Sequence, residues 1–406
     1  MIHEKGFFSA APGASQPSSH QTDRQENIPP KSGGVIRIQL NLDQPSIHHA
    51  FIVSKENTAQ GTFLMIGMAV ITVLLAFAFT FTNGFQDASS IAATFIASRS
   101  ASPKSGIIFV AGVALLGAIL GGSAVAFTIS GLLILPSDEQ TLLVLLIGLL
   151  TATVWNIITW KFGLPSSSTH SLIGGLTGAG IAAAGISGIY WGLDELVNPP
   201  HEMNGMVKIL FFFVISILIG FVGSFLMHKF SSFILRNAQR TANRTIVFFN
   251  WCAAGVMAFS NGANDSQKQL GIIALALFSA GLSTATEVPL WARVTCAILL
   301  AIGTMSGGWR IMNTLGRRIF KIEPIHSFDS QFFSSSSIAI STVAGAPVSS
   351  TQVITMSVIG VGAAENPRKV KWSVGSHILI AMAITIPVTM VISAVLYLII
   401  YPFTGG

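Results

Sequence analysis

Charged residues are scarce in this chain. They make up 9% of its 406 residues, whereas soluble domains carry about 25%. Hydrophobic residues make up 51%, and the mean hydropathy is +0.68. No alternating strand periodicity runs through the sequence, which argues against a transmembrane β-barrel. We therefore expect an all-α polytopic membrane protein.

Cysteines and enzyme motifs are also scarce. The two cysteines, Cys252 and Cys296, lie in apolar runs, so we expect neither a disulfide framework nor a cysteine metal site. The sequence contains no P-loop motif, no His/Cys metal cluster and no Gly-x-Ser-x-Gly elbow. The net charge of +6 is typical of basic cytoplasmic loops and does not indicate nucleic-acid binding. We expect neither an enzyme nor a cofactor.

The first 60 residues differ in composition from the rest. Residues 9–34 are rich in Ser, Gln, Pro, Ala and Gly, and no apolar signal-peptide core follows Met1. This composition predicts a disordered tail. The predicted organisation is a disordered N-terminal tail at 1–60, a first membrane repeat at 61–228, a basic cytoplasmic linker at 229–245 and a second membrane repeat at 246–406.

The remaining apolar runs predict about 10–12 membrane segments, since a straight span needs about 20 residues. The runs 62–98 and 246–282 are each 37 residues long and carry an Asn-Gly motif near the middle. We expect a helix that is broken or re-entrant at each motif. Non-helical backbone at that depth must be surrounded by protein or a water-filled cavity. Run length leaves open whether each run crosses once or turns back.

Basic residues gather in four connections between the apolar runs. These connections contain Arg99 and Lys104; Lys229, Arg236, Arg240 and Arg244; Arg310, Arg317, Arg318 and Lys321; and Arg368, Lys369 and Lys371. Acidic residues gather in other connections: Asp138 and Glu139; Asp194, Glu195 and Glu202; and Glu287. The positive-inside rule places the basic set in the cytoplasm. Both termini then lie outside, and the two halves have inverted topology.

Two polar stretches within the long apolar runs resemble each other. Residues 81–87 read Phe-Thr-Asn-Gly-Phe-Gln-Asp, and residues 259–268 read Phe-Ser-Asn-Gly-Ala-Asn-Asp-Ser-Gln-Lys. Asp87 is the only charged residue between 62 and 98, and Asp265 and Lys268 are the only ones between 246 and 286. Ionisable groups at membrane depth mark substrate or ion pathways. Such a motif in both halves points to a transporter site at a repeat interface.

Two hydroxyl clusters are the candidate anion site. Residues 167–169 and 349–351 both read Ser-Ser-Thr and follow Pro165 and Pro347, which suits a hairpin tip where a helix restarts. Helix starts and hydroxyls donate hydrogen bonds to an oxyanion. One cluster alone is better explained by helix packing, but two at matching places favour a site. The candidate substrate-binding residues are Ser168, Thr169, Ser350, Thr351, Asn264, Gln267 and Lys268.

The two aspartates are the candidate coupling-ion site. A bare carboxylate repels an oxyanion, so Asp87 and Asp265 make sense as groups that a bound Na⁺ or a proton neutralises. Asn83 and Asn261 add amide oxygens for the cation. The alternative for Asp265 is a structural ion pair with Lys268. That lysine has three alternatives: to attract the anion, to pair with an acid or to extend to an interface.

The sequence resembles the PiT inorganic phosphate transporter family, whose members carry one Asn-Asp motif in each half. The second polar stretch matches that motif. Residues 163–174 (Gly-Leu-Pro-Ser-Ser-Ser-Thr-His-Ser-Leu-Ile-Gly) resemble the family's Pro-Val-Ser-Thr-Thr-His hairpin, and residues 346–353 (Ala-Pro-Val-Ser-Ser-Thr-Gln-Val) resemble its second copy. Gln86, Asn261 and Gln352 stand where histidine is common in the family, which leaves the coupling ion open.

The resemblance implies broken helices, re-entrant hairpins and secondary active uptake of inorganic phosphate by symport with H⁺ or Na⁺. The substrate would be the free ion or a metal–phosphate complex, and a Na⁺ ion would bind at Asp87 and Asp265. The expected location is a cell membrane, the inner membrane of a bacterium, with the lipid bilayer as partner and with homo-oligomerisation left open. The alternatives are a sulfate permease of the same family and an anion channel.

Overall fold

The computed structural model describes the chain except for residues 1–44, 164–165, 200, 240, 307–318 and 405–406, together with the side chains of 45–60 and 87–90. Two compact units are present, Met1–Lys55 and Glu56–Gly406, and every contact discussed below lies within the second. The helix α1 begins at Pro45, inside the segment predicted to be a disordered tail. The rest of that prediction, for residues 1–44, lies outside the described residues.

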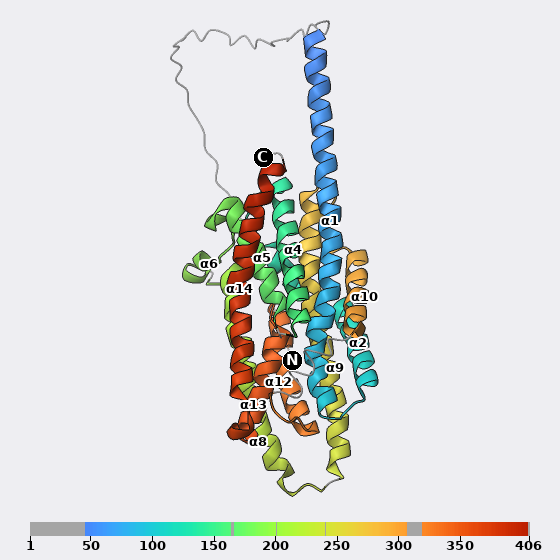
Figure 1. Ribbon diagram of the computed structural model, residues 1–406, viewed down its shortest axis with the longest axis vertical. Coiled ribbons are helices and arrows are strands. Elements are labelled where there is room, and N and C mark those ends of the chain that lie inside the picture. Colours follow the sequence, from blue (N-terminus) through green and yellow to red (C-terminus); the bar gives the residue numbers. More distant parts are fainter. Residues whose placement is uncertain (1–44, 164–165, 200, 240, 307–318, 405–406) are drawn as a thin grey trace, which may run out of the picture. The chain divides into compact units, whose positions relative to one another are not determined.

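Helices make up the regular structure of the described residues (Figure 1). Their bounds are α1 (Pro45–Ala97), α2 (Pro103–Leu120), α3 (Ala124–Ser130), α4 (Glu139–Lys161), α5 (Ser168–Ala184), α6 (Leu193–Val197), α7 (Gly205–Leu218), α8 (Ser224–Ile234), α9 (Ala242–Ser279), α10 (Leu290–Ser306), α12 (Pro324–Val343), α13 (Ser350–Glu365) and α14 (Trp372–Ile400). A π-helical turn at Ile219–Gly223 joins α7 to α8.

Six helical stretches among the described residues are long and apolar enough to cross a membrane. They lie in α1, α2, α4, α7–α8, α9 and α14. A shorter apolar helix, α10, runs beside them. The predicted all-α polytopic membrane protein is thereby confirmed, whereas the number of about 10–12 membrane segments stays a prediction.

The polar motifs do not interrupt their helices. Helix α1 continues through residues 81–87 and α9 continues through 259–268, so the predicted break at each motif is wrong. The glycines serve close packing instead, because a Cβ on Gly84 would lie 2.5 Å from the carbonyl oxygen of Leu300, and one on Gly262 would lie 2.0 Å from that of Ala114. A glycine within a helix costs only about 1 kcal/mol relative to alanine, which such packing can offset.

Two helical hairpins carry the hydroxyl clusters. The first hairpin is α4–α5 and the second is α12–α13, and we call residues 162–167 and 344–349 the first and second tips. Each tip contains a glycine with positive φ, +65° at Gly163 and +71° at Gly345. The side chains of Ser167 and Ser349 cap the helices that follow, by accepting from the backbone N–H three residues on. The helix restarts predicted after the two prolines are confirmed.

The hairpins enter the bundle from opposite ends. The start of α4, the end of α5 and the end of α14 lie together, since Gln140 Nε2 donates to the carbonyl oxygen of Ala183 at 3.0 Å and to the Tyr397 hydroxyl at 3.3 Å. The end of α13 lies beside the start of α14, which is 29 residues long, or about 43 Å at 1.5 Å per residue. The two tips therefore meet between the ends.

Three basic connections lie at the α13 end of the bundle (Figure 1). The α1–α2 connection contacts the start of α9, where Asn250 Nδ2 donates to Ser100 Oγ at 2.7 Å. The end of α8 reaches the end of α13, with His228 Nε2 3.5 Å from Glu365 Oε2. The acidic pair Asp138 and Glu139 precedes or starts α4, at the opposite end. The charge separation inferred from the sequence is thus present across the structure.

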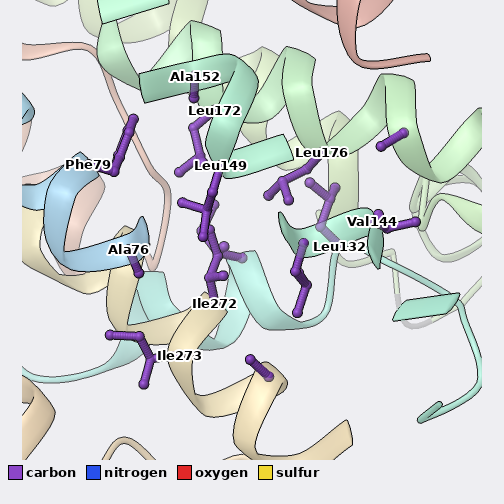
Figure 2. Close-up of a cluster of buried hydrophobic side chains, with 14 of the residues drawn as sticks. Ala76, Phe79, Leu132, Val144, Leu149, Ala152, Leu172, Leu176, Ile272 and Ile273 are labelled. Carbon is purple, nitrogen blue, oxygen red and sulfur yellow. The ribbon is translucent and has the colours of Figure 1, made fainter. Parts of the chain in front are cut away.

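The core around the first hairpin is apolar. Figure 2 shows Phe79 of α1, Leu149 of α4, Leu172 of α5 and Ile272 of α9 in one cluster. All four side chains are fully buried. Because the packed interior allows little movement, this cluster fixes the first hairpin against α1 and α9, the two helices that carry the polar motifs.

Candidate functional site

A buried polar stripe runs along one face of α9. Asn261, Asn264, Asp265 and Lys268 follow the i, i+3, i+4, i+7 spacing that places side chains on one helix face. Each is at most 3% exposed. An adjacent face, about 100° around the helix from Asn261, carries Gly262 and packs closely against α2. The sequence of α9 thus places a glycine toward α2, where the two helices pack closely, and polar side chains toward the hairpins.

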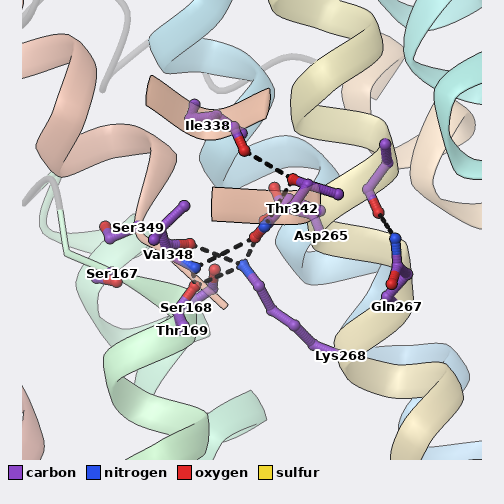
Figure 3. Close-up of polar contacts among 12 residues, drawn as sticks. Ser167, Ser168, Thr169, Asp265, Gln267, Lys268, Ile338, Thr342, Val348 and Ser349 are labelled. Carbon is purple, nitrogen blue, oxygen red and sulfur yellow. Dashed lines mark hydrogen bonds and ion pairs between the residues drawn. The ribbon is translucent and has the colours of Figure 1, made fainter. Parts of the chain in front are cut away.

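The ammonium of Lys268 lies between the two hairpin tips (Figure 3). It forms an ion pair with Asp265 one turn earlier on α9. It also donates to Thr169 Oγ1 at 2.6 Å and to the carbonyl oxygen of Val348 at 3.1 Å. Breaking a buried ion pair by removing one partner costs about 3–5 kcal/mol, so the lysine and the aspartate hold each other in place.

Asn264 fixes the second tip to α9. Its Nδ2 donates to Thr342 Oγ1 at 2.9 Å and to the carbonyl oxygen of Ala346 at 3.1 Å. Its Oδ1 accepts from the backbone N–H of Val348 at 3.2 Å. These three bonds orient the carbonyl of Val348 toward Lys268, so Asn264 positions the tip whether or not it also contacts substrate.

Gln267 lies apart from this site. Figure 3 shows it directed away from Lys268, as expected for neighbours about 100° apart around a helix. Its Oε1 accepts from the backbone N–H of Val125 at 2.8 Å, and its Nε2 donates to the carbonyl oxygens of Gly121 at 2.7 Å and Ala263 at 2.8 Å. The side chain spans the gap between α2 and α3, away from the hairpin tips where the sequence analysis placed it.

Several buried polar atoms near the tips have no partner among the described residues. They are Oδ2 of Asp265, Oδ1 of Asn261, Oγ of Ser350 and both amide atoms of Asn83. An unsatisfied buried polar atom costs about 1–3 kcal/mol. Such atoms are uncommon in native proteins and call for a ligand, ion or water. The stripe on α9 and the start of α13 therefore offer free ligand atoms.

The first polar motif faces the first hairpin. Gln86 Nε2 donates to Ser166 Oγ at 2.7 Å and to the carbonyl oxygen of Ser166 at 3.1 Å. Asn83 is one turn earlier on the same face of α1 and is fully buried. The prediction for the side chain of Asp87 lies outside the described residues. By helical spacing, Asp87 shares this face with Asn83.

The starts of α5 and α13 carry the remaining predicted substrate residues. Ser168 and Thr169 form the first turn of α5, and Ser350 and Thr351 form the first turn of α13; all four are buried. The first N–H groups of a helix lack partners within it and lie at the positive end of its dipole. Both helix starts lie at the tips, beside Lys268, so donors and positive potential gather there.

A second buried network lies at the basic end and was missed by the sequence analysis. Asp329, fully buried on α12, accepts from Ser231 Oγ at 2.7 Å and contacts His228 Nδ1 at 2.8 Å. His326 Nε2 lies 2.5 Å from Glu365 Oε2. The available signal was charge isolation, because Asp329 is the only charged residue between 323 and 365.

The ligand atoms of His228, His326 and Glu365 lie within 4.8 Å of one another, but hydrogen bonding does not favour a metal ion here. The backbone N–H of Glu323 donates to His326 Nδ1 at 3.0 Å. A neutral imidazole that accepts at Nδ1 carries its proton on Nε2. Nε2 then donates to Glu365 and has no lone pair for a metal.

Two cavities approach the bundle interior. One, of about 360 Å³, is lined by Tyr190, Lys208, Ala344 and Gly345 and reaches the second tip. The other, of about 700 Å³, opens at the basic end and its lining includes Arg99 and Lys321. Each brings a basic residue toward the interior from a different direction.

A family model described as "Phosphate transporter family" matches residues 83–393. The chain is 33% identical over 340 residues to a protein of Bacillus subtilis named "Probable low-affinity inorganic phosphate transporter", covering 83% of this chain and 98% of that protein. It is 36% identical over 336 residues to a Rhizobium meliloti protein of the same name, covering 82% and 96%. A solved structure, "The sodium-dependent phosphate transporter", aligns with a TM-score of 0.66 at 22% identity, covering 82% of this chain and 99% of that one.

Proposed function

The chain belongs to the phosphate transporter family, and we propose that it takes up inorganic phosphate across a cell membrane by symport with H⁺ or Na⁺. The observation that carries this proposal is the meeting of two hairpin tips, each with a helix start and a hydroxyl cluster, around Lys268. The phosphate transporter family consists of membrane transporters rather than enzymes. The buried polar residues therefore serve binding and translocation in this proposal.

Phosphate binds, in this proposal, between the starts of α5 and α13. Ser168, Thr169, Ser350 and Thr351 supply hydroxyls, and the first turns of both helices supply N–H groups and a favourable dipole. Hydrogen bonds to a charged ligand contribute about 1.5–3 kcal/mol each. Neutral donors of this strength bind a dianion while still letting it leave, which a transporter requires.

The coupling cation binds, in this proposal, on the polar faces of α1 and α9. Asn83 and Asn261 contribute buried amide oxygens that lack protein partners among the described residues. Asp87 and Asp265 contribute carboxylates, which a proton or a Na⁺ ion neutralises. Neutralisation removes the repulsion between carboxylate and phosphate, so cation and anion bind together and symport follows.

The matching hairpins support alternating access between inverted repeats. Each hairpin has a positive-φ glycine, a serine cap and a hydroxyl cluster at corresponding positions, and the two enter from opposite ends. Rocking one repeat against the other around a central site exposes it to each side in turn. With the basic end in the cytoplasm, the cavity beside Gly345 is the outer approach.

The test is uptake of radiolabelled phosphate into proteoliposomes with each ion gradient imposed alone. Symport predicts accumulation above the external concentration under an inward H⁺ or Na⁺ gradient and none without a gradient. Equilibration without accumulation under every gradient would indicate a channel. Stronger competition by unlabelled sulfate than by unlabelled phosphate would assign the chain to sulfate instead.

A further inference from the structure

We propose that the ammonium of Lys268 is a tethered cation that fills a monovalent-cation site between the hairpin tips, so that no diffusible cation binds beside Asp265. The inference rests on the proposed function and narrows it: of the two faces named there, only that of the first half binds a diffusible cation, and Lys268 neutralises Asp265 on the second. It implies that the diffusible cation binds in the first half, on the face of Asn83 and Asp87.

The groups around the ammonium are those of a cation site. All three of its contacts are oxygens: a carboxylate from Asp265, a hydroxyl from Thr169 and a main-chain carbonyl from Val348. Val348 lies in the non-helical turn between α12 and α13. In transporters, carbonyls of non-helical turns at the membrane midplane coordinate Na⁺, and carbonyl oxygens replace the hydration shell of a bound ion.

Lys268 is occupied as a donor in this arrangement. An ammonium has three N–H donors and no acceptor, and three oxygens already contact it. The side chain is 1% exposed, so water does not take the place of any of these groups. Direct coordination of phosphate would require Lys268 to leave one of the three, whereas the role of a resident cation requires no change.

Among the aligned motif positions, the two halves differ in charge at this one. The motifs align Asn83 with Asn261 and Asp87 with Asp265, and three residues after each aspartate stand Ser90 and Lys268. A serine carries no charge, so the first half has no tethered cation at this place. Oδ1 of Asn83 lacks a partner among the described residues, as does Oδ1 of Asn261 in the second half, so the halves differ in the tethered charge and not in the amide.

The test removes the Lys268 ammonium from the oxygen cluster and measures cation binding, so that no transport assay is needed. Lys268→Ser gives the second half the residue found in the first, and it leaves Asp265, Thr169 and Val348 around a vacant position. Thermal unfolding of the purified protein is followed while NaCl replaces choline chloride at constant ionic strength, and Na⁺ binding is measured by calorimetry. Lys208→Ser is the matched control, since Lys208 lines the nearby cavity outside the oxygen cluster.

We expect Lys268→Ser to gain a saturable, Na⁺-dependent rise in melting temperature, because a cation that binds only the folded state stabilises it. Wild type and Lys208→Ser share the first-half site with Lys268→Ser, so they should bind one Na⁺ fewer per chain and should lack this additional rise. The double variant Asp265→Asn/Lys268→Ser should lose most of the gain.

Three results would overturn the inference. One is a Lys268→Ser protein that folds but gains no Na⁺ effect. Another is equal Na⁺ binding in the Asp265→Asn/Lys268→Ser variant. The third is a Lys268→Ser protein that does not fold in NaCl, although Asp265→Asn/Lys268→Ser folds in the absence of NaCl. A cation site would accept Na⁺ in place of the lysine, so Lys268→Ser should fold in NaCl. Cation binding in detergent requires no transport, so these results stand apart from the uptake assay on wild type.

Discussion

The hydroxyl of Thr169 donates a 2.9 Å hydrogen bond to the carbonyl oxygen of Val348, 179 residues away. This bond joins the start of α5 to the second tip, and Lys268 contacts both partners. Two hairpins that enter from opposite ends are therefore closed against each other by one hydroxyl and one ammonium. Movement of one hairpin relative to the other must break these contacts.

Thr169→Val should weaken phosphate binding by about tenfold or more, because it removes a buried hydroxyl while keeping shape, and a bond to a charged ligand contributes about 1.5–3 kcal/mol. Thr177→Val is the control, since Thr177 is buried on the same helix and its hydroxyl has no partner among the described residues. The measurement is the dissociation constant for phosphate in purified protein. Equal affinities in the two variants would falsify the assignment of Thr169.

Gly262→Ala should destabilise the protein, because its Cβ would lie 2.0 Å from the carbonyl oxygen of Ala114. That oxygen belongs to the main chain of α2, which cannot move aside at low energetic cost. Overpacking of this kind typically costs about 1–3 kcal/mol. Gly112→Ala is the control on α2, since nothing lies within 4 Å of its added Cβ. Melting temperatures of the two variants decide the matter, and the idea fails if both match wild type.

The sequence predicted the helix restarts at the two tips but not the continuity of α1 and α9. The hydroxyl clusters and the helix restarts followed from proline and serine placement, which is local information. The interruption of α1 and α9 did not occur, because whether Gly84 and Gly262 break a helix or pack against another depends on neighbours distant in sequence. Those neighbours, Leu300 and Ala114, have no signature in the motifs themselves.

The predicted break in α9 also led to the wrong placement of Gln267. A continuous α9 separates Gln267 from Lys268 by about 100° around the helix, so only one of them can face the hairpins. Periodicity applied to an unbroken helix would have chosen Asn261, Asn264, Asp265 and Lys268. Asp329 was missed for a different reason, since it precedes the apolar run at 334–364 and its histidine partner lies 101 residues away.

Cysteine labelling should place the basic end in the cytoplasm. In a Cys252→Ser background, which removes the exposed cysteine and leaves Cys296 buried, Asn237→Cys reports on the α8–α9 connection. Ser187→Cys reports on the turn after α5 at the opposite end, and both positions are exposed. An impermeant maleimide should label Ser187→Cys in intact cells and Asn237→Cys only after permeabilisation. The reverse pattern would invert the orientation.

The His326–Glu365 contact should make stability pH-dependent. Burial lowers the pKa of His326 and outweighs its hydrogen bond to Glu365, which raises it. Burial alone would raise the pKa of Glu365, but the hydrogen bond from His326 and the nearby cationic charges hold that pKa below its ordinary value. Both shifts mean that the unfolded chain binds protons more readily than the folded one.

Acidification should therefore destabilise the protein, beginning as the pH falls through the ordinary histidine pKa of about 6.5 and continuing toward that of glutamate near 4.3. His326→Gln should flatten the upper part of this dependence in melting temperature. His377→Gln, at an exposed position on α14, should leave the wild-type slope unchanged. A slope that is the same in all three proteins would contradict the role of His326.

Asp87→Asn should abolish uphill uptake while leaving a folded protein. If Lys268 neutralises Asp265, then Asp87 is the motif carboxylate that needs a diffusible cation, and its amide variant removes that charge while keeping size and hydrogen-bonding capacity. Asp265→Asn acts differently, because it leaves the Lys268 ammonium buried without its carboxylate, at a cost of about 3–5 kcal/mol, and should lower the melting temperature.

Asp138→Asn is the control, since Asp138 caps α4 and asparagine caps equally well. The measurement is the phosphate accumulation ratio in proteoliposomes under a fixed inward H⁺ or Na⁺ gradient. An Asp87→Asn protein that concentrates phosphate as wild type does would show that this carboxylate does not couple transport, whatever its contribution to folding.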